Sequence, residues 1–149
     1  MPHTLRRWFV GVALLALVSC SAAVLIAAGQ HEHPAGGAHR HPQAEKLKNP
    51  VAADATSIAA GSKAYTKHCA ECHGDSGKGD GMMGDDLDPK PPDLTDADWK
   101  HGSSDGEIFT VIQHGVKGTG MKAFARKLTV HQTWDVVNYL RSIGPAKSH

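Results

Sequence analysis

Apolar residues are distributed along the chain in two distinct ways. Residues 8–28 form one nearly continuous apolar run, broken only by a glycine, a cysteine and two serines. Such a run is long enough to cross a bilayer as a helix, which takes about 20 residues. Arg6 and Arg7 precede it, and this position predicts that the N-terminal end lies in the cytoplasm. We therefore expect residues 1–29 to act as a signal peptide or membrane anchor that exports the rest of the chain.

Three forms of this N-terminal segment fit the sequence. An uncleaved anchor is favoured, because the run is long enough to span the membrane. Cleavage near Ala28 and Gly29 would instead release a soluble protein. The third form is a lipoprotein acylated at Cys20, although the residues that follow this cysteine remain largely apolar as far as Ala28.

Residues 30–56 have the composition of a flexible linker. Their apolar residues are mostly alanine, and prolines and glycines are frequent, so the segment has little surface to bury on folding. Four histidines lie in its first half: His31, His33, His39 and His41. A histidine-rich tract can bind copper, nickel or zinc, which is the alternative to a solvated linker.

Downstream of the linker the apolar positions recur at the three- and four-residue spacing of helices. The first helix is expected over residues 59–69, with Ser57 as its N-cap. Gly61 and Tyr65 lie four residues apart and so share one face of this helix. A short helix is also expected over residues 95–99, from a threonine to a tryptophan.

Two further helices are marked by capping boxes at their N-terminal ends. Ser104 and Glu107 begin the first of them, and Gly115 ends it. Thr129 and Gln132 begin the second, whose apolar residues recur along one face. A single all-α domain is therefore predicted over residues 57–147.

The segment from Gly74 to Leu94 separates the first helix from the later ones. It contains five glycines and three prolines. This composition excludes a regular helix and predicts an irregular loop. A phosphate-binding loop is the alternative, but no lysine-serine pattern and no strand-helix unit accompany the glycines.

The chemistry of the chain centres on the run Cys69-Ala70-Glu71-Cys72-His73. This C-x-x-C-H pattern is typical of covalent c-type haem attachment, in which two thiols add to the haem vinyl groups and the histidine binds the iron. A zinc site would need two further ligands, and the only other cysteine is Cys20. A redox-active dithiol would need a βαβ context, which the helical pattern does not offer. Haem attachment is therefore favoured, and the single motif predicts one haem.

Around this motif the chain resembles the class I cytochromes c. The run Gly61-x-x-x-Tyr65-x-x-x-Cys69-x-x-Cys72-His73 is similar to their first helix. The resemblance implies a small cytochrome c fold, with three to five helices around one covalently bound haem c. It also implies that the first helix crosses the C-terminal helix at the glycine.

Two details of the site follow from the same resemblance. Either Tyr139 or Leu140 is expected to face Gly61 across the helix crossing. A proline carbonyl is expected to accept a hydrogen bond from the ligand histidine and so fix the orientation of its ring. The candidates for this proline are Pro91 and Pro92.

The second axial ligand of the iron has several candidates. Met121 lies in the run Gly118-Thr119-Gly120-Met121-Lys122-Ala123-Phe124, which is similar to the methionine-ligand loop of the family, with Lys122 where proline is frequent. The resemblance therefore implies that His73 and Met121 are the two iron ligands. Met82 and Met83 follow His73 too closely to reach the opposite haem face by an ordinary path. The remaining candidates are His114, which is the next choice, His101 and His131.

Ligation by histidine and methionine predicts the class of function. A thioether ligand favours ferrous iron, and two axial ligands leave no vacant position for a substrate. We therefore expect an electron carrier rather than an enzyme, with redox proteins as its donor and acceptor. The alternative is the haem subunit of a dehydrogenase, oxidase or peroxidase-like enzyme with a labile sixth ligand. Export predicts the periplasmic side of the bacterial inner membrane, with the domain either anchored or soluble.

Charge is distributed unevenly along the exported part. Residues 71–107 carry eleven acidic and three basic residues, a net charge of −8, whereas residues 108–149 carry six basic and one acidic, a net charge of +5. Residues 51–149 together carry eleven basic and thirteen acidic residues, so nucleic-acid binding is not expected. A basic cluster around Met121 is either a docking surface for an acidic redox partner or a solvated loop. Its members are Lys117, Lys122, Arg126 and Lys127.

Overall fold

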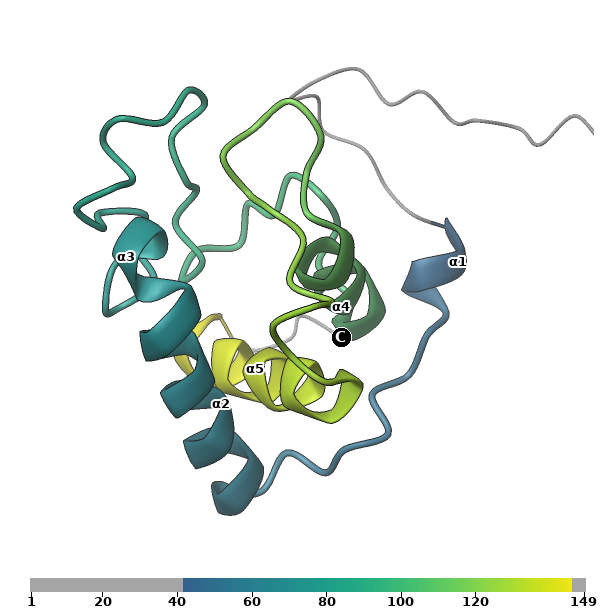
Figure 1. Ribbon diagram of the computed structural model, residues 1–149. Helices are drawn as coiled ribbons and strands as arrows, with labels where there is room; N and C mark the ends of the chain where they lie inside the picture. The colour runs from purple at the N-terminus through teal and green to yellow at the C-terminus, as the bar shows by residue number, and fades with distance from the viewer. Residues whose placement is uncertain (1–41, 146–149) are drawn as a thin grey trace, which may run out of the picture. The chain divides into compact units, whose positions relative to one another are not determined.

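The computed structural model describes residues 42–145, and this part of the chain is helical with no β-strand (Figure 1). Its five helices are α1 (Pro42–Glu45), α2 (Ala55–His68), α3 (Ala70–His73), α4 (Asp105–His114) and α5 (Val130–Ile143). The expected all-α fold is confirmed. None of these helices is long and apolar enough to cross a membrane. The expected signal or anchor over residues 1–29 and the histidines of the linker lie outside the described residues.

Helix α2 begins four residues earlier than the sequence predicted. Asp54 is its N-cap, and its side chain accepts a hydrogen bond from the backbone N–H of Ser57 at 2.9 Å. The prediction of Ser57 as the N-cap is therefore wrong. Both residue types cap helices well, but a start at Asp54 places Ser57 in the first turn. There its hydroxyl is buried and donates to Oδ1 of Asp135 at 2.6 Å.

The two predicted capping boxes are both present. In α4 the Ser104 side chain accepts from the backbone of Glu107, whose carboxylate accepts from the Ser104 backbone at 3.0 Å. In α5 Thr129 and Gln132 make the same reciprocal pair of bonds. Each box satisfies N–H groups that have no partner inside the helix, which is why these patterns locate helix starts reliably.

The short helix expected over residues 95–99 does not form. The side chain of Asp93 accepts hydrogen bonds from both the backbone and the hydroxyl of Thr95. The side chain of Asp96 accepts from the backbone of Asp98 in the same manner. Aspartate side chains that bond two residues ahead stabilise turns in competition with helix, and the segment is a series of bends.

The crossing of α2 and α5 is the main contact of the fold (Figure 1). A Cβ built on Gly61 would collide with the backbone carbonyl of Asp135 and lie 2.9 Å from the Cβ of Tyr139. Only glycine allows the helices to approach this closely. The residue that faces Gly61 is therefore Tyr139, whereas Leu140 is buried in the core.

The hydrophobic core lies between α2, α4 and α5. The rings of Phe109 and Trp134 stack with centroids 4.1 Å apart, and this pair joins α4 to α5. Offset stacking of this kind adds to the stabilisation from burying the rings. The fully buried apolar residues are Tyr65, Ala70, Ile108, Ile112, Val116, Leu128, Trp134, Val136, Val137 and Leu140.

Residues 42–54, which we call the N-terminal strap, pack against the domain instead of forming the end of a flexible linker. The carbonyl of Ala44 and the side chain of Leu47 lie against Gly106 of α4. Asn49 donates to the side chain of Asn138 in α5 at 2.7 Å. Composition suggested a linker because these anchoring partners are distant in sequence and belong to other elements. The ordered domain thus extends upstream of residue 57.

Candidate functional site

The C-x-x-C-H motif lies where α2 ends and α3 begins. Cys69 caps both helices, and its N–H donates to the carbonyl of Tyr65 at 2.7 Å. Its own carbonyl accepts from the N–H groups of Cys72 and His73, at 3.1 and 2.9 Å. The two thiols and the imidazole are therefore carried by a single tight turn that backbone hydrogen bonds hold together.

The two thiols of the motif differ from those of a redox-active pair in the pKa of Cys69. Cys69 and Cys72 are free and half-buried. Burial, with a smaller effect of Cys72, raises the pKa of the Cys69 thiol to about 12. A redox-active dithiol needs a thiol with a lowered pKa. Within residues 42–145 no three His, Cys, Asp or Glu side chains come together at a spacing that could hold a metal ion.

The segment of residues 74–84, which we call the glycine wrap, presses its backbone against the motif. The N–H of Gly79 donates to the carbonyl of His73 at 2.8 Å, and the N–H of Met83 to that of Glu71 at 2.9 Å. A Cβ on Gly81 would lie 2.5 Å from the Glu71 carbonyl oxygen. Glycine is needed at Gly81 and Gly84 because a side chain would not fit between the loop and the motif backbone.

His73 presents a buried nitrogen to the prolines after the wrap. Its Nδ1 is buried without a hydrogen bond of good geometry. Burial lowers the pKa of His73, and the backbone of Pro92, which interacts with the ring, opposes this shift. The Pro92 carbonyl is therefore close to the ring without forming a well-aligned bond. The carbonyl oxygens of both prolines lie near Gly79, where an added Cβ would collide with that of Pro91 and lie 3.2 Å from that of Pro92.

Tyr65 supports the same turn from within α2. Its hydroxyl is buried and donates to the carbonyl of Gly74 at 2.8 Å. The sequence analysis placed this residue only on the same helix face as Gly61. The bond to Gly74 gives it a second role, because it holds the first residue after His73.

Met121 lies in the loop that follows α4, which we call the Met121 loop (residues 116–124). Its backbone N–H donates to the Thr119 hydroxyl at 3.1 Å, and its carbonyl accepts from Val116 at 3.0 Å. Phe124 closes the loop by donating to the carbonyl of Ile112 at 3.0 Å. These bonds give a definite conformation to the loop, with the Met121 side chain half-buried.

The other candidates for the second ligand are arranged differently. Met82 and Met83 are exposed, with 84% and 48% of their surfaces accessible. His114 is also exposed. The side chain of His131 is 72% exposed, with Nε2 3.7 Å from the carboxylate of Asp135. His101 is half-buried.

The motif and the Met121 loop stand apart in Figure 1, above the crossing of α2 and α5. Leu87, which follows the glycine wrap, connects the two regions. A Cβ on Gly120 would lie 2.7 Å from both methyl carbons of Leu87, so this side chain rests on the loop one residue before Met121. The sequence analysis missed Leu87. The feature of the sequence that could have indicated its packing is that it is the one apolar residue among three aspartates, Asp85, Asp86 and Asp88.

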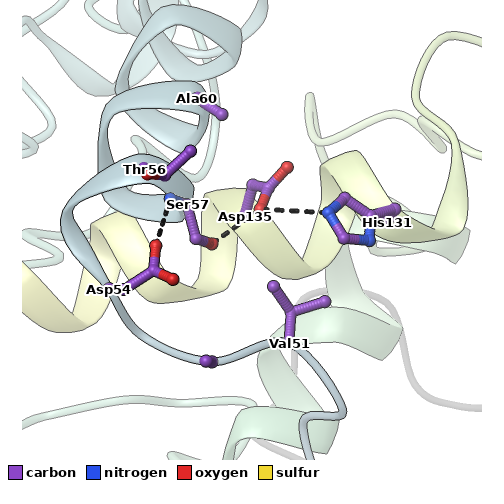
Figure 2. A pocket seen from close by; sticks show the side chains of 8 residues that line it. Val51, Asp54, Thr56, Ser57, Ala60, His131 and Asp135 are labelled. Carbon is purple, nitrogen blue, oxygen red and sulfur yellow. Dashed lines mark hydrogen bonds and ion pairs between the residues drawn. The ribbon is translucent and has the colours of Figure 1, made fainter.

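A pocket of about 210 Å³ lies elsewhere, between the strap, the first turns of α2 and the start of α5 (Figure 2). The carboxylate of Asp135 is central to it, where it accepts from Ser57 and faces His131. None of its lining residues belongs to the motif, the wrap or the Met121 loop. The lining consists of Val51, Ala52, Asp54, Thr56, Ser57, Ala60, His131 and Asp135.

The residues at the motif fit a covalently attached haem. The turn offers two free thiols for thioether bonds and an imidazole whose Nδ1 is withdrawn from solvent and whose ring lies near the Pro92 backbone. A histidine that binds a metal through one nitrogen commonly directs the other to a backbone carbonyl or a similar acceptor. The half-buried Met121 belongs to a separate, hydrogen-bonded loop, and a thioether there is a suitable soft ligand for iron.

Comparison with known proteins gives the same assignment. The family model described as Cytochrome c matches residues 58–144. The chain is 34% identical over 89 residues to the Cbb3-type cytochrome c oxidase subunit FixP of Bradyrhizobium diazoefficiens, which covers 60% of this chain and 28% of that protein. It is 31% identical over 99 residues to the Cbb3-type cytochrome c oxidase subunit CcoP of an Azospirillum species, covering 66% and 33%. The chain thus spans about a third or less of the length of these relatives.

Solved structures agree at the level of the fold. A chain of the reducing HAO-like protein complex of Kuenenia stuttgartiensis superposes with a TM-score of 0.60 at 29% identity, covering 66% of this chain and 50% of that one. Cytochrome CL from Methylophaga aminisulfidivorans superposes with a TM-score of 0.52 at 24% identity, covering 66% and 58%. The chain therefore belongs to the cytochrome c family, as a class I c-type cytochrome domain with covalently bound haem c and a function in haem-based electron transfer.

Proposed function

We propose that residues 57–147, together with the strap, form a monohaem electron carrier with histidine and methionine ligation. Cys69 and Cys72 would hold the haem through thioether bonds, and His73 and Met121 would bind its iron. The observation that carries this proposal is the turn at residues 69–73. It combines two free thiols with an imidazole whose Nδ1 is buried and whose ring lies near the backbone of Pro92.

The bound haem supplies one-electron exchange between ferric and ferrous iron. The chain's own residues set the conditions for that exchange. The Pro92 carbonyl orients the His73 ring. The Met121 thioether favours the ferrous state and raises the reduction potential. Since both axial positions are taken by protein ligands, the arrangement supports electron transfer over substrate chemistry at the iron.

The similarity to Cbb3-type oxidase subunits supports a role beside a larger redox enzyme. In this role the domain accepts an electron from one redox protein and delivers it to another, without a catalytic site of its own. The alternative is a haem subunit of a redox enzyme in which Met121 is labile and the iron can open to a small ligand. Ligand-binding spectra of the ferric protein distinguish the two.

We further propose that the domain works outside the cytoplasm. Residues 1–29 serve as the signal or anchor, and residues 30–41 connect it to the strap. The apolar run 8–28 and the two preceding arginines support this arrangement. The domain would then face the periplasm, tethered to the inner membrane or released from it.

The basic residues around the Met121 loop form a docking surface for an acidic redox partner. Lys117, Lys122, Arg126 and Lys127 are all exposed. Lys127 is held in place over the ring of Phe124, with Nζ 5.3 Å from the centroid. Opposite charges on two proteins accelerate their encounter, and this attraction weakens as salt is added.

Spectra of ligand variants test the proposal. The full-length protein, produced with covalently attached haem, is expected to show a low-spin ferric spectrum with the long-wavelength band of methionine-ligated iron. Met121→Ala should lose this band and bind imidazole, whereas His114→Gln should keep the band. Cys69→Ser with Cys72→Ser should leave the chain without covalent haem. A high-spin wild-type spectrum, or an unchanged Met121→Ala spectrum, would refute the ligand assignment.

A further inference from the structure

Two methionines form an exposed apolar surface beside the C-x-x-C-H turn. Met82 and Met83 are 84% and 48% exposed, and they are adjacent in the chain. Single exposed apolar side chains are ordinary on protein surfaces. Two adjacent methionines at the edge of a cofactor site are different, because methionine is enriched in protein interfaces and adapts to the shape of its partner.

The backbone beneath these methionines is firmly held. The N–H of Met83 donates to the carbonyl of Glu71, inside the motif, at 2.9 Å. On either side, Gly81 and Gly84 pack against the backbone of the motif, and a Cβ on Gly84 would lie 2.5 Å from the Cys72 carbonyl. The backbone of Met82 and Met83 is therefore held next to Cys72, one of the two haem attachment points proposed above.

Acidic residues border the methionines. Glu71, Asp80 and Asp86 are exposed and lie beside Met82 and Met83 in sequence or through the bond to Glu71. Asp85 is also exposed, but its carboxylate pairs with Lys90 at 2.7 Å, so this pair adds little net charge. The border is therefore negative, the opposite sign to the exposed basic residues around the Met121 loop.

We propose that Met82 and Met83, with their acidic border, form a second docking surface that takes a redox protein with an exposed apolar centre and a basic rim. The inference rests on the proposed function, since the surface matters for electron transfer only if Cys72 holds the haem. The sign of the charge determines the partner: a basic rim is attracted to Glu71, Asp80 and Asp86, and an acidic protein is repelled. The two surfaces therefore select partners of opposite charge.

Two small reagents of opposite charge probe the two surfaces on the full-length haem protein. Tris(1,10-phenanthroline)cobalt(III) is a cationic oxidant with apolar ligands, and ferricyanide is a hydrophilic anionic oxidant. Oxidation of the reduced protein by each reagent is followed by stopped-flow absorbance at low ionic strength. Met82→Gln with Met83→Gln keeps the charge and removes the apolar surface.

The methionine double variant should slow oxidation by the cobalt complex by about fivefold and leave ferricyanide oxidation unchanged. Asp80→Asn with Asp86→Asn should have the same selectivity. Lys117→Gln with Lys122→Gln should slow ferricyanide oxidation alone. Val130→Asn, at an apolar position that is 61% exposed on α5, serves as the matched control and should alter neither rate.

Two results would overturn the inference. In one, the methionine variant oxidises at the wild-type rate with the cobalt complex. In the other, the methionine variant is oxidised more slowly by both reagents to the same extent, as a change in its reduction potential would cause. A parallel redox titration would show such a change. Failure of the proposed function is a distinct outcome, because a chain without covalent haem would show no haem absorbance change with either reagent.

Discussion

Gly61 of α2 lies directly against the backbone carbonyl of Asp135 in α5, where the two 14-residue helices cross. The crossing leaves no room for a side chain on either the carbonyl side or the side of the Tyr139 Cβ. Both obstacles are rigid, since one is backbone and the other is the first carbon of a partly buried tyrosine. The separation of the two helices is therefore set at this residue.

Replacing this glycine should destabilise the domain. Gly61→Ala should lower the free energy of unfolding by about 1–3 kcal/mol through overpacking, although alanine alone favours helix by about 1 kcal/mol. Urea unfolding of the haem protein measures the change. Ala59→Gly, at an exposed position of the same helix, should cost only about 1 kcal/mol. Wild-type stability in Gly61→Ala would show that the helices can separate without cost.

Asn138 of α5 connects this helix to the strap and to the first turn of α2. Its replacement should therefore weaken the attachment of the strap and lower the stability of the domain. Its Nδ2 lies within hydrogen-bonding distance of the Ser57 hydroxyl at 2.9 Å and of the carbonyls of Val51 and Ala52 at 3.3 and 3.2 Å. Asn138→Ala should cost about 2 kcal/mol, because buried acceptors lose their donor. Hydrogen exchange in residues 49–54 should accelerate as well. Asn49→Ala, at the half-buried partner, should cost less, and equal losses would contradict the central role of Asn138.

Leu87 should control how firmly Met121 is held. Leu87→Ala removes the side chain that rests on Gly120. Because this change should destabilise the closed loop by about 1.5 kcal/mol, imidazole should bind the ferric iron about tenfold more tightly. Imidazole titration followed by absorbance measures this affinity. Leu47→Ala, a variant of matched size in the strap, should leave it unchanged. Equal imidazole affinities in wild type and Leu87→Ala would show that the Met121 loop keeps its conformation without the Leu87 side chain.

Tyr65 should make the domain sensitive to alkaline pH. Burial raises the pKa of Tyr65 well above its usual value of 10. Below about pH 10 the phenol is neutral in both the folded and the unfolded chain. Above it only the unfolded chain ionises, so the raised pKa costs about 1.4 kcal/mol of stability per pH unit until the folded-state pKa is reached.

Tyr65→Phe cannot ionise and should not show this loss. At neutral pH the variant should be less stable by about 1 kcal/mol, because the bond to the Gly74 carbonyl is missing. The difference from wild type should shrink as pH rises beyond about 10. Urea unfolding at neutral and alkaline pH tests both statements. If the difference in unfolding free energy between wild type and Tyr65→Phe stays constant across this pH range, the loss of stability at alkaline pH is caused by other groups.

Local signals predicted most of the fold. The starts of α4 and α5 were correct because a capping box lies within four residues of sequence. The start of α2 was misplaced because Asp54 and Ser57 are both good caps, and a bond to the distant Asp135 favours burial of the serine. Asp93 and Asp96 replaced an expected helix with turns through side-chain bonds that apolar spacing does not reveal.

The candidate site also has a part that the sequence predicts and a part that it does not. Cys69, Cys72 and His73 belong to a contiguous motif, so their shared turn could be predicted from the sequence. Distant relationships could not be predicted, because the position of Leu87 against Gly120 and that of the Pro92 backbone near the His73 ring depend on how the loops fold back. These interactions join residues whose positions in sequence carry no shared pattern.

The attachment of the strap to Asn138 has a mechanical consequence. A pull on residue 42 would be transmitted first to the interface of α1 with α4, then to the Asn49–Asn138 bond, and only afterwards to the first turn of α2. The strap should therefore detach from the domain before the force reaches the turn at residues 69–73. In single-molecule stretching from residue 42, a low-force extension by the length of the strap should precede the main unfolding event.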